Sequence, residues 1–390
     1  MARLNRREFV AGGAALGALA LGTPARAVFD DPLAGSAQIA VIGPLTGDSI
    51  RLGEQIGNGV RAALDDANRL RGPMDRLFVM RTFDDQNSLA SGLVNAQFCA
   101  DDATLICAIG HLSGRVTDAA LQTYVNGRLP LIVPASTYDK ITAHGYGGVL
   151  RLETKDSTEG NLAGAVVMSL VKPKSSVVLY QDADYGIDAA AGYHDRMLSE
   201  KIASQAIRFA WDKPDFSTIA RAALEAKPDV IYLAGVVKDM GPILPALRLN
   251  GYKGAIYGSQ GFFDAATIDK YKGDAEGLII STSMPPLQLA PTVFRIKGDF
   301  ERRYGAFTPL SAFAYASAQI AIAAVKRGGA NDRLAVSRAL SFATPYDTAV
   351  GTFTFGSNGD PQDPNAYFYT VRDGKWAYLQ SAHRSNFVLK

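Results

Sequence analysis

Histidine, cysteine and tryptophan are scarce in this chain of 390 residues, which holds four, two and two of them. No spacing typical of a metal site relates the four histidines, which are His111, His144, His194 and His383. The enzyme motifs G-x-S-x-G, H-E-x-x-H and G-x-x-x-x-G-K-S/T are also missing. We therefore expect no metal, no cofactor and no catalytic residue, although groups brought together only by folding leave no such signature.

Long apolar runs and an excess of one charge are missing as well. Beyond the N-terminus, no stretch approaches eighteen consecutive apolar residues, the length that a membrane span requires. The formal net charge is +2, but four arginines and a single acid fall within residues 1–27, so the remainder is close to neutral. A near-neutral surface lacks the electrostatic footprint of a protein that binds nucleic acid or an anionic membrane.

The N-terminus has the pattern of an export signal. Arg6 and Arg7 precede a short apolar run at 11–22, and Ala25-Arg26-Ala27 has the small-x-small form that a signal peptidase cuts. The arginine pair resembles the twin-arginine signal, which exports a protein already folded. We predict that residues 1–27 are removed after about Ala27 and that the protein lies in the periplasm. The alternative is an amphipathic N-terminal helix that frays.

The two cysteines fall on different predicted elements in an oxidising compartment. Cys99 lies on a helix expected at 88–101, and Cys107 lies within a strand expected at 104–109. A helix and a strand rise unequally from the turn between them, whereas a disulfide requires Cα atoms within about 7 Å. Two buried thiols are favoured, and a disulfide remains the alternative.

Strand and helix patterns alternate along the chain, whose length predicts two domains. Buried apolar runs such as "AQIAVIG" are followed by helices with apolar residues three and four apart. This rhythm predicts an α/β first lobe at 36–150 and a second at 151–283, each with parallel strands covered by helices. Asp156-Ser157-Thr158-Glu159 is expected to cap the N-terminus of a helix that runs to about Val171. Periodicity leaves open which lobe the segment 284–390 joins.

In open parallel sheets, ligands bind at the loops that follow the carboxyl ends of the strands, and interfaces between lobes are also common sites. Here those loops are 44–53, 84–88, 110–115, 134–138, 181–186, 235–239 and 258–263. His111 in one of them is interpreted as a structural hydrogen-bonding residue in preference to a site residue. Asp84-Asp85 is interpreted as a solvated turn in preference to a catalytic acid pair.

Seven segments occur in the order seen in one family: "IAVIGPLTG", "FDDQNS", "AIGHLSGRVT", "LIVPAST", "DADYG", "DFSTIARAALEAKPDVIYLAG" and "GTFTFGSNGD". They resemble the periplasmic leucine/isoleucine/valine-binding proteins, the solute receptors of ABC importers. The resemblance covers 36–380 and implies the type I periplasmic-binding fold, with two Rossmann-like lobes, a three-crossing hinge and closure on a ligand. It also implies that 284–390 returns to the first lobe and completes both. The expected partners are a small-molecule ligand and an inner-membrane ABC permease, and the expected state is a monomer.

The resemblance places part of the family's ligand site on this sequence. The loop that holds the ligand's carboxylate and ammonium matches Ala135, Ser136 and Thr137, and the tyrosine that closes over the ligand matches Tyr185. A serine that caps the carboxylate falls at Gly114, so its hydroxyl is missing.

Other positions depart from the family. The acid that pairs with the ammonium falls near Gln260, or at Asp264 if the alignment shifts, and two aromatic positions fall near Leu52 and Val236. The family's first-lobe disulfide is absent, because its two positions hold Gln86 and Ser113.

These departures predict a different ligand. A buried ammonium without a carboxylate partner is unfavourable, and the amide of Gln260 does not neutralise a charge. Arg51 and Arg115 lie in two first-lobe loops, either as partners for a carboxylate or as rim residues facing water. An apolar carboxylic acid or a neutral apolar molecule is therefore expected in place of a free amino acid. The alternatives are a sensor of the same fold and, less favoured, an enzyme that uses the cleft.

Overall fold

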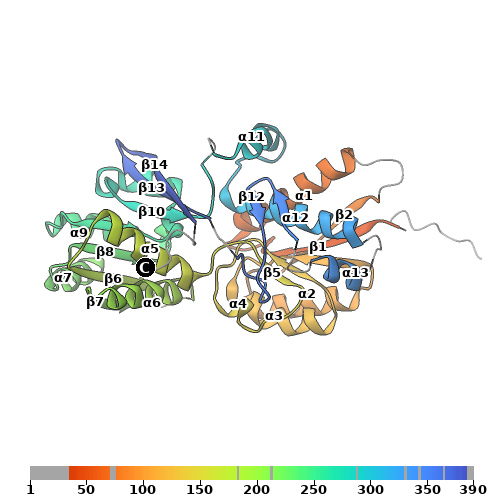
Figure 1. Ribbon diagram of the computed structural model, residues 1–390, viewed down its shortest axis with the longest axis horizontal. Coiled ribbons are helices and arrows are strands. Elements are labelled where there is room, and N and C mark those ends of the chain that lie inside the picture. The colour runs from red at the N-terminus through yellow and green to blue at the C-terminus, as the bar shows by residue number, and fades with distance from the viewer. Residues whose placement is uncertain are drawn as a thin grey trace, which may run out of the picture. The chain divides into compact units, whose positions relative to one another are not determined.

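The computed structural model describes residues 35–70, 76–181, 184–210, 214–286, 289–328, 332–340, 344–362 and 365–383. The chain from Gly35 onward forms one compact unit, and its α/β architecture of two lobes, predicted from the sequence, is confirmed (Figure 1). The predicted signal segment 1–27 lies outside the described residues.

The first lobe is built on a five-stranded sheet in which every strand is parallel to its neighbours, in the order β2-β1-β3-β4-β5. Its strands are β1 (Ala37–Gly43), β2 (Phe78–Asp84), β3 (Leu105–Ile109), β4 (Leu131–Val133) and β5 (Val149–Arg151). All residues of β1, β3, β4 and β5 are buried, which explains their nearly continuous apolar sequences.

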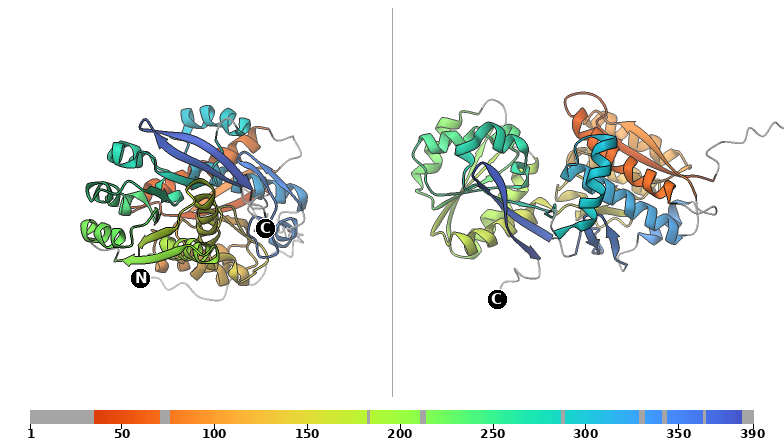
Figure 2. Two further views of the ribbon diagram at one scale, coloured as in Figure 1. Left: turned by 60° about the vertical axis from the view of Figure 1, so that its left-hand side comes forward. Right: turned by 90° about the horizontal axis from the view of Figure 1, so that it is seen from above.

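Two layers of helices cover this sheet (Figure 2). One core joins the sheet to α1 (Ile50–Arg69), α11 (Pro291–Tyr304), α12 (Pro309–Gly328) and α13 (Arg333–Ala339). The other joins it to α2 (Leu89–Asp101), α3 (Gly114–Asn126) and α4 (Lys140–Ala143). Arg333 links α13 to the segments around α2, β3 and α3. Its guanidinium donates to the carbonyl oxygens of Cys99, Ala100, Asp102, Leu105 and Gly127.

The second lobe contains a seven-stranded sheet in the order β14-β13-β10-β9-β8-β6-β7. Its strands are β6 (Ser175–Gln181), β7 (Ala203–Phe209), β8 (Val230–Ala234), β9 (Ala255–Gly258), β10 (Ile279–Thr282), β13 (Asn365–Arg372) and β14 (Lys375–His383). The first five are parallel, whereas β13 and β14 are antiparallel, so this sheet is mixed instead of purely parallel. A two-residue turn at Asp373-Gly374, both with positive φ, folds β14 back on β13.

The helices of the second lobe are α5 (Asp156–Leu170), α6 (Asp184–Ser199), α7 (Phe216–Glu225), α8 (Val237–Met240), α9 (Ile243–Leu249) and α10 (Ala265–Tyr271), with short 3₁₀ turns η1 (Gln260–Phe262) and η2 (Lys272–Ala275). The segment 237–249 is divided into two short helices, α8 and α9. Pro242 stands at the break, where its missing N–H and its ring are incompatible with a continuous helix.

The chain passes between the lobes three times, after β5, after β10 and after β12. The segment 284–390 contributes α11 to α13 and the small sheet of β11 (Tyr346–Thr348) and β12 (Gly351–Phe353) to the first lobe. It contributes β13 and β14 to the second lobe.

Both cysteines are free and buried, which confirms the preferred interpretation of two buried thiols. Burial raises the pKa of each thiol to about 12, which disfavours the reactive thiolate form. Among the described residues, no single helix is long and apolar enough to cross a membrane, and only the bent pair α11 and α12 meets those criteria together.

Candidate functional site

A cavity of about 420 Å³ lies at the carboxyl ends of the parallel strands of both sheets. The first lobe lines it with 112–114, after β3, and 135–138, after β4. The second lobe lines it with Asp156, Tyr185, Val236, Gln260 and Gly261. Segments that follow six different strands therefore meet at one cavity, as expected for a ligand site in open parallel sheets.

The structure brings together seven of the ten ligand-binding residues predicted from the sequence, namely Gly114, Ala135, Ser136, Thr137, Tyr185, Val236 and Gln260. Arg51, Leu52 and Arg115 do not line the cavity, because they occupy exposed positions in the first turns of α1 and α3. Within the described lining there is consequently no lysine or arginine to pair with a carboxylate.

The N-terminus of α3 forms part of the first-lobe wall and suits an anion. Ser113 caps this helix, with its Oγ accepting the N–H of Val116 at 3.5 Å. The first N–H groups of a helix have no partner within it and carry a partial positive charge. Because Ser113 and Gly114 line the cavity beside the hydroxyl-bearing Ser136 and Thr137, this wall suits a carboxylate.

Gly114 is required by its neighbours. A Cβ at this position would lie 2.4 Å from the Cβ of Tyr138 and 2.9 Å from the Oγ of Ser136. The serine that the resemblance expects at this position does not fit without movement of Tyr138. The close approach of Tyr138 and Ser136 to Gly114 thus leaves no room for that side chain as the loops are placed.

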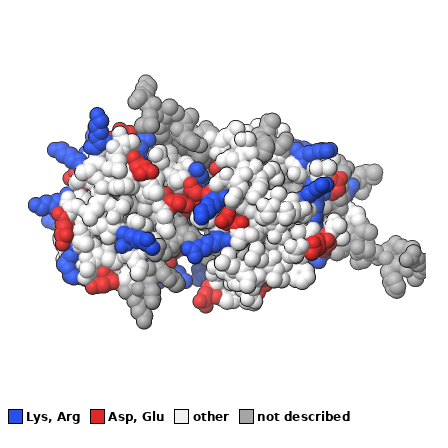
Figure 3. Space-filling view, turned by 90° about the horizontal axis from the view of Figure 1, so that it is seen from below, with Lys and Arg blue, Asp and Glu red and all other residues white. Residues whose placement is uncertain are grey.

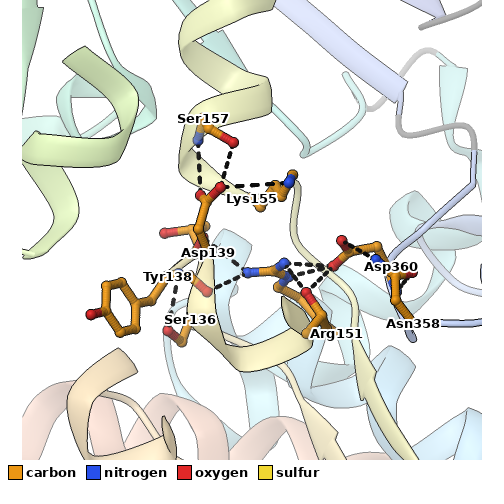
Figure 4. A network of polar contacts seen from close by, with 10 residues as sticks. Ser136, Tyr138, Asp139, Arg151, Lys155, Ser157, Asn358 and Asp360 are labelled. Atoms are coloured by element: carbon orange, nitrogen blue, oxygen red, sulfur yellow. Dashed lines mark hydrogen bonds and ion pairs between the residues drawn. The ribbon is translucent and has the colours of Figure 1, made fainter. Parts of the chain in front are cut away.

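Buried polar contacts fix the loop 135–139 (Figure 4). The fully buried Arg151 donates to the carbonyl oxygens of Thr137 at 3.0 Å and Tyr138 at 2.7 Å, and it pairs with Asp360 at 2.5 Å. Asp139 accepts hydrogen bonds from the N–H and Oγ of Ser157, at the start of α5. The sequence carries no signal for this network, because Asp360 lies 209 residues from Arg151.

Asp156 is the site residue that the sequence did not indicate. The predicted cap is corrected, because the N-cap of α5 is Lys155 and Asp156 is the first residue of the helix. Its N–H donates to the carbonyl oxygen of Thr137 at 2.9 Å. Asp156 is 1% exposed and lines the cavity, and neither of its carboxyl oxygens makes a hydrogen bond.

The protonation of Asp156 follows from these surroundings. Burial raises its pKa well above the usual range, the charges of Glu159 and Asp139 raise it further, and the nearby Thr137 and Arg151 offset part of the rise. These surroundings favour the neutral carboxyl group, which donates a hydrogen bond, over the carboxylate unless a cation lies beside it.

Glu159 organises the second-lobe wall. Its carboxylate accepts the backbone N–H of Gln260 at 2.6 Å, the Ser281 hydroxyl at 3.2 Å and the Tyr185 hydroxyl at 3.4 Å. The Tyr185 hydroxyl in turn accepts the N–H of Gly261 at 3.0 Å. Burial raises the pKa of Glu159 to about 7. Tyr185 is thus held in place before any ligand arrives.

The side-chain amide of Gln260 is already engaged. Its Nε2 donates to Glu153 at 3.4 Å, and its Oε1 accepts the N–H of Ser283 at 3.2 Å. Asp264, the other candidate for the family's acid, caps α10 by accepting the N–H of Ala266 at 2.7 Å. In the described lining of the cavity, the acidic residue is therefore Asp156.

His111 and the acids after β2 lie outside this cavity. His111 is fully buried, with Nδ1 2.7 Å from Asp85 and Nε2 2.9 Å from the Tyr124 hydroxyl, which confirms its structural role. The expectation of a solvated turn was wrong for Asp85, which is buried against His111. Asp84 accepts the N–H of Leu45 at 2.8 Å. No group of metal-binding side chains occurs among the described residues.

Residues 36–375 match the family described as periplasmic binding protein. A Leu/Ile/Val-binding protein of Citrobacter freundii is 27% identical over 330 residues, covering 83% of this chain and 87% of that protein. The Leu/Ile/Val-binding protein of Escherichia coli K12 is 27% identical over 350 residues, covering 88% and 93%.

Two solved structures show the same fold. A leucine binding protein from Thermotoga maritima has a TM-score of 0.80 at 20% identity, covering 90% of this chain and 99% of that one. A solute binding protein of an ABC transporter from R. palustris, in complex with benzoate, has a TM-score of 0.76 at 19% identity, covering 90% and 97%.

Proposed function

Because this chain belongs to the periplasmic binding protein family, we propose that it is the solute-binding receptor of a bacterial ABC importer of the branched-chain amino-acid class. The Leu/Ile/Val-binding relatives and the type I fold of the structural neighbours support this assignment. It would be exported to the periplasm by the signal in residues 1–27, which would then be removed. Its partner would be an inner-membrane permease.

Binding is the whole of the proposed mechanism. A small ligand enters the cavity, the two lobes close on it about the three crossings, and the closed form docks on the permease. The walls support closure on a ligand because loop 135–139 and Tyr185 are held in place on opposite lobes. No residue is assigned a catalytic role.

The ligand is proposed to carry a carboxylate and an amine. The observation that carries this is the carboxyl of Asp156, buried in the cavity without a partner and without a lysine or arginine in the described lining. The ligand's carboxylate would lie at the N-terminus of α3, and its ammonium beside Asp156 and Thr137. Asp156 would supply the acidic partner for the ammonium, which the family has and which position 260 of this chain lacks.

The second candidate is the ligand expected from the sequence, an apolar carboxylic acid. Val236 in the lining and the benzoate complex of a structural relative favour it. The two candidates require opposite charges on Asp156. An ammonium ionises Asp156 and releases a proton on binding, whereas an apolar acid needs Asp156 to stay protonated beside the ligand's own negative charge.

The test is titration calorimetry of leucine and of benzoate across a pH series, in buffers of different ionisation enthalpy. Leucine is expected to bind more tightly as the pH rises, with release of up to about one proton. Asp156→Asn should weaken leucine binding roughly tenfold to a hundredfold and remove its share of the pH dependence. Asp264→Asn is the matched control, since Asp264 caps a helix away from the cavity.

Benzoate that binds more tightly than leucine and weakens with rising pH would establish the apolar-acid class instead. Reconstitution with a permease in vesicles separates transport from sensing, because a sensor would bind the same ligand without supporting uptake.

A further inference from the structure

Glu153 joins the first crossing between the lobes to the ligand cavity. It follows β5, is 6% exposed and is not among the described residues that line the cavity. Its Oε2 accepts a hydrogen bond from Nε2 of Gln260 at 3.4 Å, and Oε1 of the same amide accepts the N–H of Ser283 at 3.2 Å. Gln260 lines the cavity from the second lobe, and Ser283 begins the second crossing after β10. The amide of Gln260 therefore links two crossings to the ligand site.

The third crossing ends at the same place. A second cavity, of about 10 Å³, is lined by Thr154 of the first crossing, Ser283 of the second and Ala366 at the start of β13. Glu159 and Gln260 complete this part of its lining. A cavity of this size holds about one water molecule. The crossings are therefore packed closely around Gln260, and a rotation of one lobe against the other would change the contacts there.

Two charged groups face the carboxyl group of Glu153. The Arg151 guanidinium is an opposite charge, but it is already bound to Asp360 and to two backbone carbonyl oxygens. Glu159 on α5 is a like charge, and its own hydrogen-bond partners all lie in the second lobe. Among the described residues, no cation forms an ion pair with Glu153.

Burial changes the protonation of Glu153. Figure 3 shows one face of the molecule, on which acidic and basic side chains are interspersed at the surface. Exposed carboxyl groups of this kind ionise below about pH 5. Burial raises the pKa of Glu153 to about 8, the charge of Glu159 adds to the rise, and Ser283, Gln260 and Arg151 oppose it. At neutral pH the buried carboxyl group is therefore mostly uncharged.

We propose that Glu153 is a positioning residue of the ligand site, which holds Gln260 and two crossings in this arrangement while its carboxyl group is neutral. This role rests on the proposed function, in which the lobes close about the crossings. A carboxylate at this place would lack hydration and would face Glu159, so its ionisation favours an arrangement that opens the junction to water. Glu153 would thus make the lobe movement, and the position of Gln260 in the cavity, depend on pH.

The direction of the pH effect follows from linkage between protonation and conformation. The pKa of Glu153 is about 8 in the buried arrangement, whereas an exposed glutamate has a pKa of 4.5. The buried arrangement is therefore fully favoured below about pH 5 and loses this advantage as the pH rises towards about 8. The ratio of the two arrangements should change by up to about tenfold per pH unit in that range.

The test measures the distance between the lobes in the absence of ligand. Spin labels on Gln122→Cys in α3 and Ser199→Cys in α6 report this distance by double electron–electron resonance, since both positions are exposed. Cys99 and Cys107 are buried and do not compete for the label. In the labelled chain, the distance distribution is expected to change between about pH 5 and about pH 8.

Glu153→Gln is neutral at every pH and nearly keeps the size of the side chain, so it should stay close to the low-pH distribution throughout. Glu225→Gln is the matched control, because Glu225 is an exposed acid of the second lobe and its loss should leave the change as it is. An equal change in Glu153→Gln and the labelled chain overturns the proposal, as does a labelled chain whose distribution is independent of pH.

A second variant covers the case in which Glu153→Gln does not fold. Ser283 lowers the pKa of Glu153, so Ser283→Ala should move the change in distance to higher pH, and an unmoved change would overturn the proposal. Because no ligand enters these measurements, their failure leaves the choice between leucine and benzoate to the calorimetry. Failure of both ligands to bind would, in turn, leave the distance measurement valid.

Discussion

The two lobes differ in how their buried polar groups are paired. In the first lobe, Asp85, His111 and Tyr124 form a closed chain of contacts, and Arg151 is saturated by carbonyl oxygens and Asp360. Among the described buried side chains of this lobe, the Ser317 hydroxyl is the exception.

The second lobe leaves more of its buried groups without partners. Asp156 and the hydroxyls of Tyr193, Tyr232 and Tyr257 make no hydrogen bond. The three rings pack together, with centroids 4.5 Å and 5.8 Å apart. The first lobe therefore forms a wall whose polar groups are already paired, whereas the second lobe responds to protons and to a ligand that supplies a missing partner.

The largest effect is expected from breaking the paired network of the first lobe. Arg151→Gln should lower the free energy of unfolding by about 3–5 kcal/mol, because it leaves Asp360 and two carbonyl oxygens without their buried partner. Urea unfolding measures this loss. Arg302→Gln is the control, since its ion pair with Asp299 is exposed and should contribute less than about 1 kcal/mol. Equal losses for both variants would contradict the difference.

The pH dependence of stability should come largely from two buried carboxyl groups, those of Glu153, between β5 and α5, and Glu159, on α5. Burial raises the pKa of Glu153 to about 8 and that of Glu159 to about 7. The folded state then holds protons that the unfolded chain has already lost. Stability should therefore be highest near pH 5 and fall as the pH rises towards 8, by at most about 1.4 kcal/mol per pH unit for each group.

Glu153→Gln tests the source of this pH dependence. It removes one titrating group, so the free energy of unfolding should decline less between about pH 5 and 8. Val177→Ala, a core change in the same lobe, should lower stability equally at every pH. If stability declines with pH equally in the wild type, Glu153→Gln and Val177→Ala, the carboxyl group of Glu153 is excluded as the source of the decline.

The smallest expected effect is the difference in stability between two variants that each remove one buried tyrosine hydroxyl. Tyr124→Phe should cost about 1–2 kcal/mol, since it leaves the buried Nε2 of His111 without a partner. Tyr257→Phe should be neutral or slightly stabilising, because its hydroxyl has no hydrogen bond to lose. Thermal unfolding of both variants, in the same buffer, decides whether the lobes differ in this way.

Local patterns in the sequence predicted most of the fold. The apolar runs of β1 and β3 and the periodic faces of α1 and α7 each specify their own element without knowledge of the rest. The position of α12 against α1 has no such local signal, since it depends on contacts between residues far apart in the sequence.

The site was predicted less completely for the same reason. The loops after the strands were identified, because the carboxyl ends of parallel strands are a general location for ligands. Asp156 was assigned to a helix cap, since its residue type and position suit that role. Only the folded chain shows that no N–H group of α5 is capped by it and that its carboxyl faces the cavity.

The first lobe is completed by helices from the last third of the chain. Arg333 reaches the carbonyl oxygen of Cys99 across 234 residues. At roughly 5–20 residues per second, a ribosome needs on the order of 12–50 seconds to make the residues between them. During that time one face of the first sheet has no α12 to cover it, while five strands of the second sheet are already complete. The lobe that is synthesised first is therefore expected to be the last to fold.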